Sequence, residues 1–181
     1  MGNWLSSSEE RVGEFAPNAP EADRWRDQAR QMGAQRRLLA EQSQQAYQRG
    51  DHSAAKRLSD ESKRCLAKAD QFNSNAAAMI FEANNKGRPP FEVDLHGLYV
   101  KEAVAYAKHA IDRASRSRDP PPVVFIVGRG LHSDDGEAKL RPAVMQLAQQ
   151  YNVNIQPGRP NPGCVTVEFA TEPDHSWCSI Q

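Results

Sequence analysis

The spacing of apolar side chains divides this chain into a helical first half and a mixed second half. From Asp23 onward, a narrow stripe of apolar and small residues recurs at heptad-like spacing, and a second stripe follows after a break. The stripes consist of Trp25, Ala29, Met32, Leu39 and Ala46, and then of Leu58, Ser62, Cys65, Ala69, Phe72, Ala76, Met79 and Ala83. The break, Arg49-Gly50-Asp51, contains a helix-ending glycine, and Asp51 or Ser53 can cap the next helix. The pattern predicts a long antiparallel helical hairpin over residues 23–86.

A different periodicity begins after the segment 87–90, Gly-Arg-Pro-Pro, which is expected to form a stiff hinge. Apolar residues alternate with polar ones from Phe91 to Leu95, as they do in a strand, and a glycine ends the run. This alternation places Asp94 and His96 together on the opposite face of the strand.

Two helices and three further strands complete the predicted domain. An amphipathic helix is expected from about Val100 to Ser117, and the apolar run from Val123 to Val127 is expected to be a strand buried on both faces. Because the helix would connect the two strands as a crossover, the strands should be parallel. The remaining elements are a helix with Leu140, Val144, Leu147, Ala148 and Tyr151 on its apolar face, and short strands at Val153–Gln156 and Val165–Phe169. The order βαβαββ predicts an α/β domain over residues 87–170, with a flexible leader at 1–22 and a tail at 171–181.

The carboxyl ends of the first two strands carry the candidate chemistry. Parallel strands place these ends at one edge of the sheet, so Asp94 and His96 should lie beside Gly128-Arg129-Gly130. A histidine can act as a general base or acid, and a neighbouring carboxylate can orient it. An arginine can bind a phosphate with its fork of donors, and the glycine amides offer a shallow anion nest. This set suits phosphodiester cleavage, and because RNA supplies its own 2′-hydroxyl as the attacking group, no metal is required.

Three motifs in this order resemble the Smr (small MutS-related) domain family. They are Asp-Leu-His-Gly at 94–97, Gly-Arg-Gly-x-His-Ser at 128–133, and the turn Asn161-Pro162-Gly163 before the last strand. The resemblance covers roughly Phe91 to Phe169 and implies a two-layer sandwich similar to the C-terminal domain of bacterial translation initiation factor three. The turn between the predicted helices, Ala46-Tyr47-x-x-Gly50-Asp51-x-x-Ala54, is similar to the helical extension of unknown function that often precedes eukaryotic Smr domains.

The resemblance also implies a function and a set of site residues. Family members include endonucleases, several of which act on RNA in translation quality control, so we expect an endonuclease that cleaves RNA phosphodiesters. Asp94, His96 and Arg129 are the expected catalytic residues. The residues expected to contact phosphate or nucleic acid are Gly97, Gly128, Gly130, His132, Ser133, Asn161 and Gly163. A fragment that starts at Phe91 is expected to cleave short RNA on its own.

Simpler roles remain open for several of these residues. Asp94 can cap the crossover helix, His96 can bond to backbone in a turn, and the glycines can merely form a tight turn. The histidine and serine of the second motif can cap their loop. Asp134 and Asp135 can join Asp94 in holding a divalent cation, so a metal-dependent enzyme is the alternative to one that needs no cofactor.

Charge keeps a second class of function open. The chain has 23 basic and 23 acidic residues, and the part from Phe91 onward has 9 basic and 11 acidic residues, a net charge of −2. A free-standing, high-affinity nucleic-acid binder usually carries a basic excess. The alternative to a nuclease is a non-catalytic RNA- or ribosome-binding adaptor that contacts phosphate through the same loops and a protein partner through the helical hairpin.

The cysteines and the two ends of the sequence bear on location. Cys65, Cys164 and Cys178 show no paired or zinc-binding spacing, which is typical of reduced thiols in the cytoplasm. Gly2 with Ser6 fits the N-myristoylation pattern, and Cys178 in Cys-Ser-Ile-Gln fits the prenylation pattern. These patterns predict lipid attachment that holds a cytoplasmic protein on the cytosolic face of a membrane.

Overall fold

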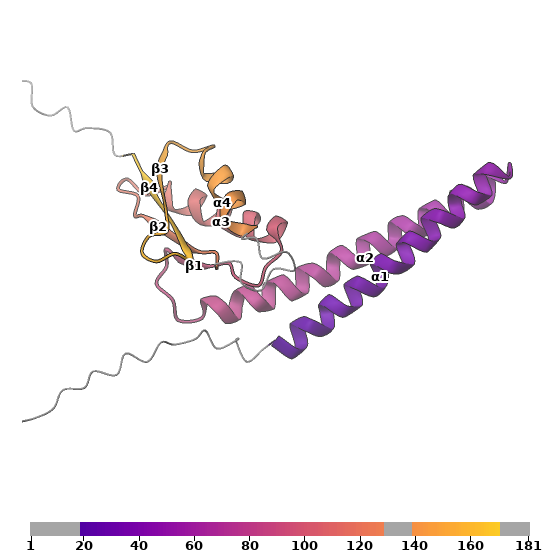
Figure 1. The fold of residues 1–181 in the computed structure, drawn as a ribbon, viewed down its shortest axis with the longest axis horizontal. Helices are drawn as coiled ribbons and strands as arrows, with labels where there is room; N and C mark the ends of the chain where they lie inside the picture. The colour runs from indigo at the N-terminus through magenta and orange to yellow at the C-terminus, as the bar shows by residue number, and fades with distance from the viewer. Residues whose placement is uncertain (1–18, 129–138, 171–181) are drawn as a thin grey trace, which may run out of the picture.

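The computed structural model describes residues 19–128 and 139–170, which form a helical hairpin and an α/β domain (Figure 1). Helix α1 spans Ala19–Gln48 and helix α2 spans His52–Asn85. In the turn between them Gly50 has a φ of 82°, in the left-handed region that favours glycine. The Asp51 carboxylate accepts a hydrogen bond of 2.9 Å from the Ala54 backbone N–H. The predicted hairpin is confirmed, and Asp51 rather than Ser53 caps helix α2.

Small side chains line the seam where α1 and α2 pack against each other. The buried seam residues include Ala22, Ala29, Leu39, Ala46, Ala55, Cys65, Ala69 and Ala76. Two polar seam positions bond across the hairpin, because Ser62 donates to the Arg36 carbonyl at 3.2 Å and Ser43 donates to the Ala55 carbonyl at 2.8 Å. The 34 residues of α2 give it a length of about 51 Å. The hairpin therefore stands out from the α/β domain as a long arm (Figure 1).

The α/β domain contains four strands and two helices in the predicted order. The elements are β1 (Glu92–Asp94), α3 (Val100–Ala114), β2 (Val123–Ile126), α4 (Leu140–Ala148), β3 (Val153–Pro157) and β4 (Cys164–Phe169). The strand order is β1-β2-β4-β3, with β1 parallel to β2 and β4 antiparallel to both of its neighbours. Helices α3 and α4 pack on one side of the sheet (Figure 1). The predicted βαβαββ two-layer architecture, preceded by the hairpin, is confirmed.

The prediction that β2 is buried on both faces is wrong. Val123 and Phe125 are fully buried, whereas Val124 and Ile126 are only partly buried. Both helices cover the same face of the sheet, so the alternate side chains of β2 lie on the less covered face. Asp94 pairs with Ile126 in the parallel register and therefore lies on that second face.

The hairpin and the α/β domain share one hydrophobic core. Ala77 is buried in the same cluster as the strands of the sheet, and Phe81 packs against that cluster. The Phe81 ring stacks on the Tyr106 ring of α3 with a centroid distance of 3.9 Å. On α1, the buried Arg26 guanidinium donates two hydrogen bonds to the Glu102 carboxylate of α3, at 2.7 and 2.6 Å. The base of the arm is therefore packed into the domain at two points.

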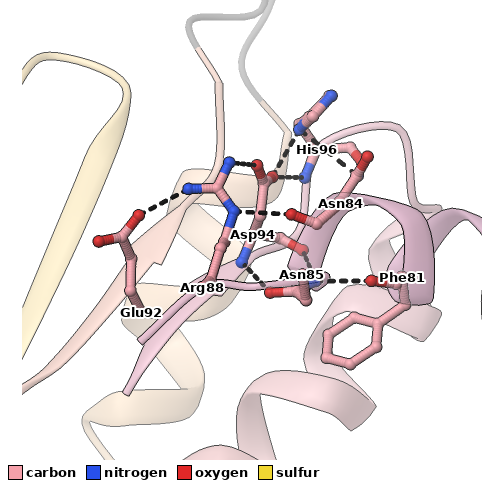
Figure 2. A network of polar contacts seen from close by, with 7 residues as sticks. All are labelled: Phe81, Asn84, Asn85, Arg88, Glu92, Asp94 and His96. Carbon is pink, nitrogen blue, oxygen red and sulfur yellow. Dashed lines mark hydrogen bonds and ion pairs between the residues drawn. The ribbon is translucent and has the colours of Figure 1, made fainter. Parts of the chain in front are cut away.

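The segment 87–90, expected to be a stiff hinge, is instead a tight corner within this packed region. Gly87 has a φ of 77°, which turns the chain at the end of α2. The Arg88 N–H donates to the Asn85 carbonyl at 3.2 Å, and the Glu92 N–H donates to the Pro89 carbonyl at 3.1 Å. The corner returns the chain into β1 directly beside the end of α2 (Figure 2).

Membrane attachment by a spanning helix is not indicated within residues 19–128 and 139–170, since no helix there is both long and apolar enough to cross a bilayer. Gly2 and Cys178 lie outside the described residues. Lipid attachment at either position therefore stays a prediction.

Candidate functional site

Asp94 is the buried centre of the candidate site. It is the last residue of β1 and only 2% exposed. Its Oδ1 accepts a hydrogen bond from the His96 backbone N–H at 3.1 Å and lies 2.5 Å from His96 Nδ1. Its Oδ2 accepts a hydrogen bond of 2.8 Å from the Arg88 guanidinium. Both oxygens of this carboxylate are thus engaged by cationic or N–H groups (Figure 2).

His96 contacts Asp94 through one ring nitrogen and presents the other to the outside. An Nδ1–H that donates to Asp94 fixes the tautomer in which Nε2 is free to exchange a proton. The ring is 44% exposed, and its outer nitrogen points away from the cluster of polar side chains (Figure 2). The Asn84 side-chain amide donates to the His96 carbonyl at 2.9 Å and so holds the backbone in place. The predicted pairing of Asp94 with His96 is present, in the geometry of an oriented general acid or base.

The electrostatics of the site favour the protonated imidazole. The hydrogen bond to Asp94 raises the pKa of His96 above its usual value of 6.5, and the charge of Asp94 acts in the same direction. Partial burial of the ring and the positive charge of Arg88 oppose this increase. His96 can therefore carry its proton near neutral pH and can still release it to a base or accept it back.

Arg88, Asn84 and Asn85 complete the site, and sequence reasoning missed all three. Arg88 donates to the Glu92 carboxylate and to the Asn84 carbonyl, each at 2.6 Å, in addition to Asp94. The Asn85 side-chain amide bonds to both backbone groups of Asp94, donating to its carbonyl at 2.9 Å and accepting from its N–H at 2.8 Å. These residues belong to the end of the hairpin and the corner that follows it. The glycine and prolines around Arg88 predicted a stiff hinge, and no local pattern indicated that the Arg88 side chain would reach the site.

The second loop of the site is built on close backbone contacts between Gly128 and Gly163. The Gly163 carbonyl accepts hydrogen bonds from the N–H groups of Val127 and Gly128, at 2.8 and 3.1 Å. The Asn161 side chain accepts from the Gly163 N–H at 2.9 Å, and the Asn161 carbonyl accepts from the Cys164 N–H, also at 2.9 Å. Asn161 and Gly163 therefore form the turn that sets β4 beside the end of β2.

The fold already uses some of the donors expected to bind phosphate, although phosphate contact by these residues stays a prediction. The pattern of glycines predicts that the amide of Gly128 forms part of an anion nest, yet its N–H already donates within the fold. The Gly163 N–H is engaged in the same way, and Gly163 is buried. Gly97 is exposed beside His96 and has a φ of 78°, a turn that glycine makes easily.

Several predicted site residues lie outside the described residues. They are Arg129, Gly130, His132, Ser133, Asp134 and Asp135. Ile126 is the register partner of Asp94, and Gly128 follows Ile126 by two residues, as His96 follows Asp94. Gly128 therefore lies at the same edge of the sheet as His96.

The alternative metal site of Asp94, Asp134 and Asp135 stays a prediction, because two of its three ligands lie outside the described residues. No cluster of three or more histidine, cysteine or carboxylate side chains that could hold an ion occurs within 19–128 and 139–170. A cation bound to Asp94 would have to compete with Arg88 and His96 for its two oxygens.

Comparison with known proteins places this chain in a family. The family model of the Smr domain matches residues 93–167, and the model described as a domain of unknown function (DUF1771) matches residues 23–85. The solution structure of the B3BP Smr domain is 31% identical in sequence, with a TM-score of 0.42, and the match covers 54% of this chain and 96% of that chain.

Curated relatives resemble this chain across both regions. Endonuclease NBR9 of Saccharomyces cerevisiae is 38% identical over 167 residues, 92% of this chain and 65% of that protein. A Smr domain-containing protein of Schizosaccharomyces pombe is 33% identical over 180 residues, 89% of this chain and 87% of that protein. NEDD4-binding protein 2 of Homo sapiens is 29% identical over 130 residues, 69% of this chain and only 7% of that protein. The chain thus belongs to the Smr domain family and carries an N-terminal DUF1771 helical region.

Proposed function

We propose that this protein is a Smr-type endonuclease that cleaves RNA phosphodiesters, with a place in translation-linked mRNA quality control. The observation that carries the proposal is the contact of 2.5 Å between His96 Nδ1 and the buried Asp94 carboxylate, which leaves Nε2 directed outward. A binding loop has no need of a paired carboxylate and imidazole, whereas proton transfer requires both the orientation and the raised basicity that this pair supplies. The name of the yeast relative, an endonuclease, supports the same class of activity.

His96 would act on the proton of the attacking or leaving oxygen. In its neutral form, Nε2 accepts the proton of the 2′-hydroxyl while the 2′-oxygen bonds to phosphorus, the bond to the 5′-oxygen breaks, and water supplies the proton of the departing 5′-hydroxyl. In its protonated form, Nε2 donates its proton to the departing 5′-oxygen, and water takes up the proton of the 2′-hydroxyl. Asp94 orients the ring and stabilises the imidazolium, and Arg129 is assigned to the charge that develops on the phosphoryl oxygens. The products are a 2′,3′-cyclic phosphate and a free 5′-hydroxyl, and the scheme requires no cofactor.

Cleavage of a labelled single-stranded RNA by the full chain in the presence of a chelator tests this proposal. His96→Ala should lower the rate by at least about 100-fold, the usual contribution of a general acid or base. The matched control is His109→Ala, since His109 is an exposed histidine of α3. Arg129→Ala should also lose most of the rate.

A second substrate separates the chemistry from binding. The same oligonucleotide with 2′-deoxyribose throughout should bind and remain uncut, because it lacks the internal nucleophile. Cleavage of that strand, or full activity of His96→Ala in chelator, would exclude the assigned roles. Activity that appears only with a divalent ion would favour the alternative in which Asp94, Asp134 and Asp135 bind a metal.

The second candidate function is a non-catalytic adaptor that binds RNA or the ribosome. The net charge of −2 from Phe91 onward supplies little long-range attraction for a polyanion, so this half suits a protein that reaches RNA or the ribosome through a partner bound by the hairpin. A nuclease with this charge would depend on another surface, or on a protein partner bound by the hairpin, for delivery to its substrate. Tight RNA binding by the wild-type chain without any cleavage would support the adaptor.

A further inference from the structure

We propose that the end of the DUF1771 hairpin is part of the Smr active site, with Arg88 and Asn85 as positioning residues for Asp94 and His96. The inference rests on the proposed function and deepens it. Arg88 lies three residues beyond the last residue of α2 and donates to Asp94 at 2.8 Å. Asn85 is that last residue and bonds to both backbone groups of Asp94.

Asn85 takes the place of a neighbouring strand. Among the described strands, β1 lies at the edge of the sheet and is paired with β2 on one side only. The carbonyl of Phe91 and the N–H of Leu95 bond toward β2, so the N–H and carbonyl of Asp94 point to the open side. The Asn85 side chain satisfies both of these groups at 2.8 and 2.9 Å. Its amide also donates to the Phe81 carbonyl at 2.8 Å, which ties the edge of the sheet to α2.

Arg88 makes burial of the Asp94 charge tolerable. A carboxylate that is 2% exposed loses nearly all of its hydration and needs ionic and hydrogen-bonding partners. Arg88 supplies one such partner, and its guanidinium is fixed in turn by the Glu92 carboxylate and the Asn84 carbonyl. This anchoring leaves the other oxygen of Asp94 directed at His96 (Figure 2).

The same arrangement sets the charge balance around the imidazole. Among the described residues, the charged groups that face His96 are Asp94 and Arg88, with Glu92 on the far side of Arg88. Arg88 lowers the pKa of His96 and Asp94 raises it. Removal of Arg88 takes away one nearby cation, but it also frees Asp94 to move, and loss of the Asp94 hydrogen bond, the larger influence, lowers the pKa of His96.

The test combines the pH dependence of cleavage with an NMR titration of the His96 ring in the full chain. Arg88→Ala should lower kcat/KM on the order of 10- to 100-fold, the cost of a displaced catalytic group. It should also lower the pH at which His96 titrates, because a displaced Asp94 no longer accepts a hydrogen bond from the ring. Arg88→Lys should restore the titration midpoint toward the wild-type value while it recovers only part of the rate, because a lysine supplies charge without the three-point fork. Arg24→Ala, an exposed arginine of α1, is the matched control.

The NMR titration keeps this inference separate from the proposed function. If the wild-type chain cleaves no RNA, the shift of the His96 midpoint in Arg88→Ala still tests the positioning role. An unchanged midpoint together with an unchanged rate would overturn it. If Arg88→Ala is poorly folded, Asn85→Asp provides a second variant, because it removes the donor to the Asp94 carbonyl and should likewise lower both the rate and the His96 midpoint.

A different observation supports a second inference: we infer that the outer half of the hairpin binds the phosphate backbone of structured RNA. Residues 33–68 carry eight basic and four acidic side chains, a net charge of +4. The base of the hairpin, 19–32 with 69–85, carries three basic and five acidic side chains, a net charge of −2. The neutral total of the chain conceals this polarity, which places positive charge on the part of the arm farthest from the α/β domain (Figure 1).

The basic side chains of the outer half are available to a ligand. Of the eight, only Lys63 forms an ion pair within the described residues, with Asp60 at 3.6 Å. Near the tip, a shallow hollow of about 540 Å³ is lined by Tyr47, His52 and Lys56 among other polar residues. Tyr47 is 64% exposed and stands edge-on to His52 at 4.8 Å. Exposed aromatic rings beside cationic side chains suit RNA, which offers unstacked bases next to phosphates.

Binding of a fluorescent RNA stem-loop at several salt concentrations tests this second inference, in a His96→Ala background that prevents cleavage. The double change Lys56→Gln and Arg57→Gln should weaken binding. It should also reduce the slope of log binding constant against log salt concentration by about one for each phosphate that the variant no longer neutralises. Arg30→Gln, which removes a basic residue paired with Asp27 at the base of the arm, should change neither. Equal affinity and slope in all variants would overturn the inference, as would a protein partner that binds the tip and leaves RNA binding unaltered.

Discussion

The contact between Arg26 and Glu102 gives a sharp test of how the hairpin is attached to the α/β domain. Arg26 is 6% exposed, and its two terminal nitrogens bond to the two oxygens of Glu102 at 2.7 and 2.6 Å. The guanidinium also lies 3.8 Å from the centre of the Tyr99 ring and 3.0 Å from the Asn73 side-chain oxygen. Arg26→Met keeps much of the side-chain volume and removes all of these polar interactions.

The expected cost follows from the burial of the partner that remains. The Glu102 side chain is 15% exposed, so removal of Arg26 leaves a largely buried carboxylate with only the Tyr99 N–H as a donor. Breaking a buried pair from one side costs about 3 to 5 kcal/mol, and the partial exposure of Glu102 places the expectation near the lower end, about 3 kcal/mol. Removal of the cation from the face of the Tyr99 ring adds about 0.5 to 1 kcal/mol.

Urea unfolding of four proteins measures these values. They are the wild type, Arg26→Met, Glu102→Gln and the double variant, whose cost should be smaller than the sum of the two single costs because no unpaired charge is left. Arg30→Met is the matched control, since Arg30 pairs with Asp27 on the exposed side of the same helix, and it should change stability by less than about 0.5 kcal/mol. Equal losses of unfolding free energy in Arg26→Met and Arg30→Met, with additive losses in the double variant, would refute the idea that the buried Arg26–Glu102 pair attaches the hairpin to the domain.

Three further predictions concern the site and the ends of the chain. Because the folded-state pKa of His96 is raised from 6.5, the ion pair of His96 should stabilise the fold fully below about pH 6.5 and lose this effect as the pH rises through the folded-state pKa. The difference in unfolding free energy between the wild type and His96→Gln should therefore fall from pH 5 to 9. The decrease should be no more than about 1 kcal/mol, because the ring is half-exposed. The fragment 91–170 is expected from sequence to cleave RNA alone. It lacks the packing of Phe81 and the hydrogen bonds of Asn85 and Arg88. It should therefore unfold at a lower urea concentration, and cleave RNA more slowly, than a fragment that begins within α1. Intact mass of protein from its native cells tests the lipid predictions, since Gly2→Ala and Cys178→Ser should each remove one added mass, and unmodified ends in the wild type would disprove both.

Sequence periodicity determined the elements of this fold and the central pair of the site. The heptad-like stripes around Gly50 predicted the two hairpin helices, and the alternation from Phe91 to Leu95 predicted β1. The spacing of Asp94 and His96 predicted that they would meet at the end of that strand, where the structure places them 2.5 Å apart. These inferences succeed because the period of apolar residues reports directly which side chains share a face of a helix or strand.

Tertiary structure decided what surrounds that pair. The alternation assigned Asp94 to a polar face, and only the packing of α2 against the edge of β1 shows that this face is covered and the carboxylate buried. Arg88 lies in a Gly-Arg-Pro-Pro segment whose local pattern predicted a hinge, and Arg26 is 76 residues away from its partner Glu102. Such interactions depend on where two complete elements come to rest against each other, and no periodicity within either element encodes that placement. The hairpin is thus readable from the sequence as a pair of helices, and its role as one wall of the site follows from the tertiary structure alone.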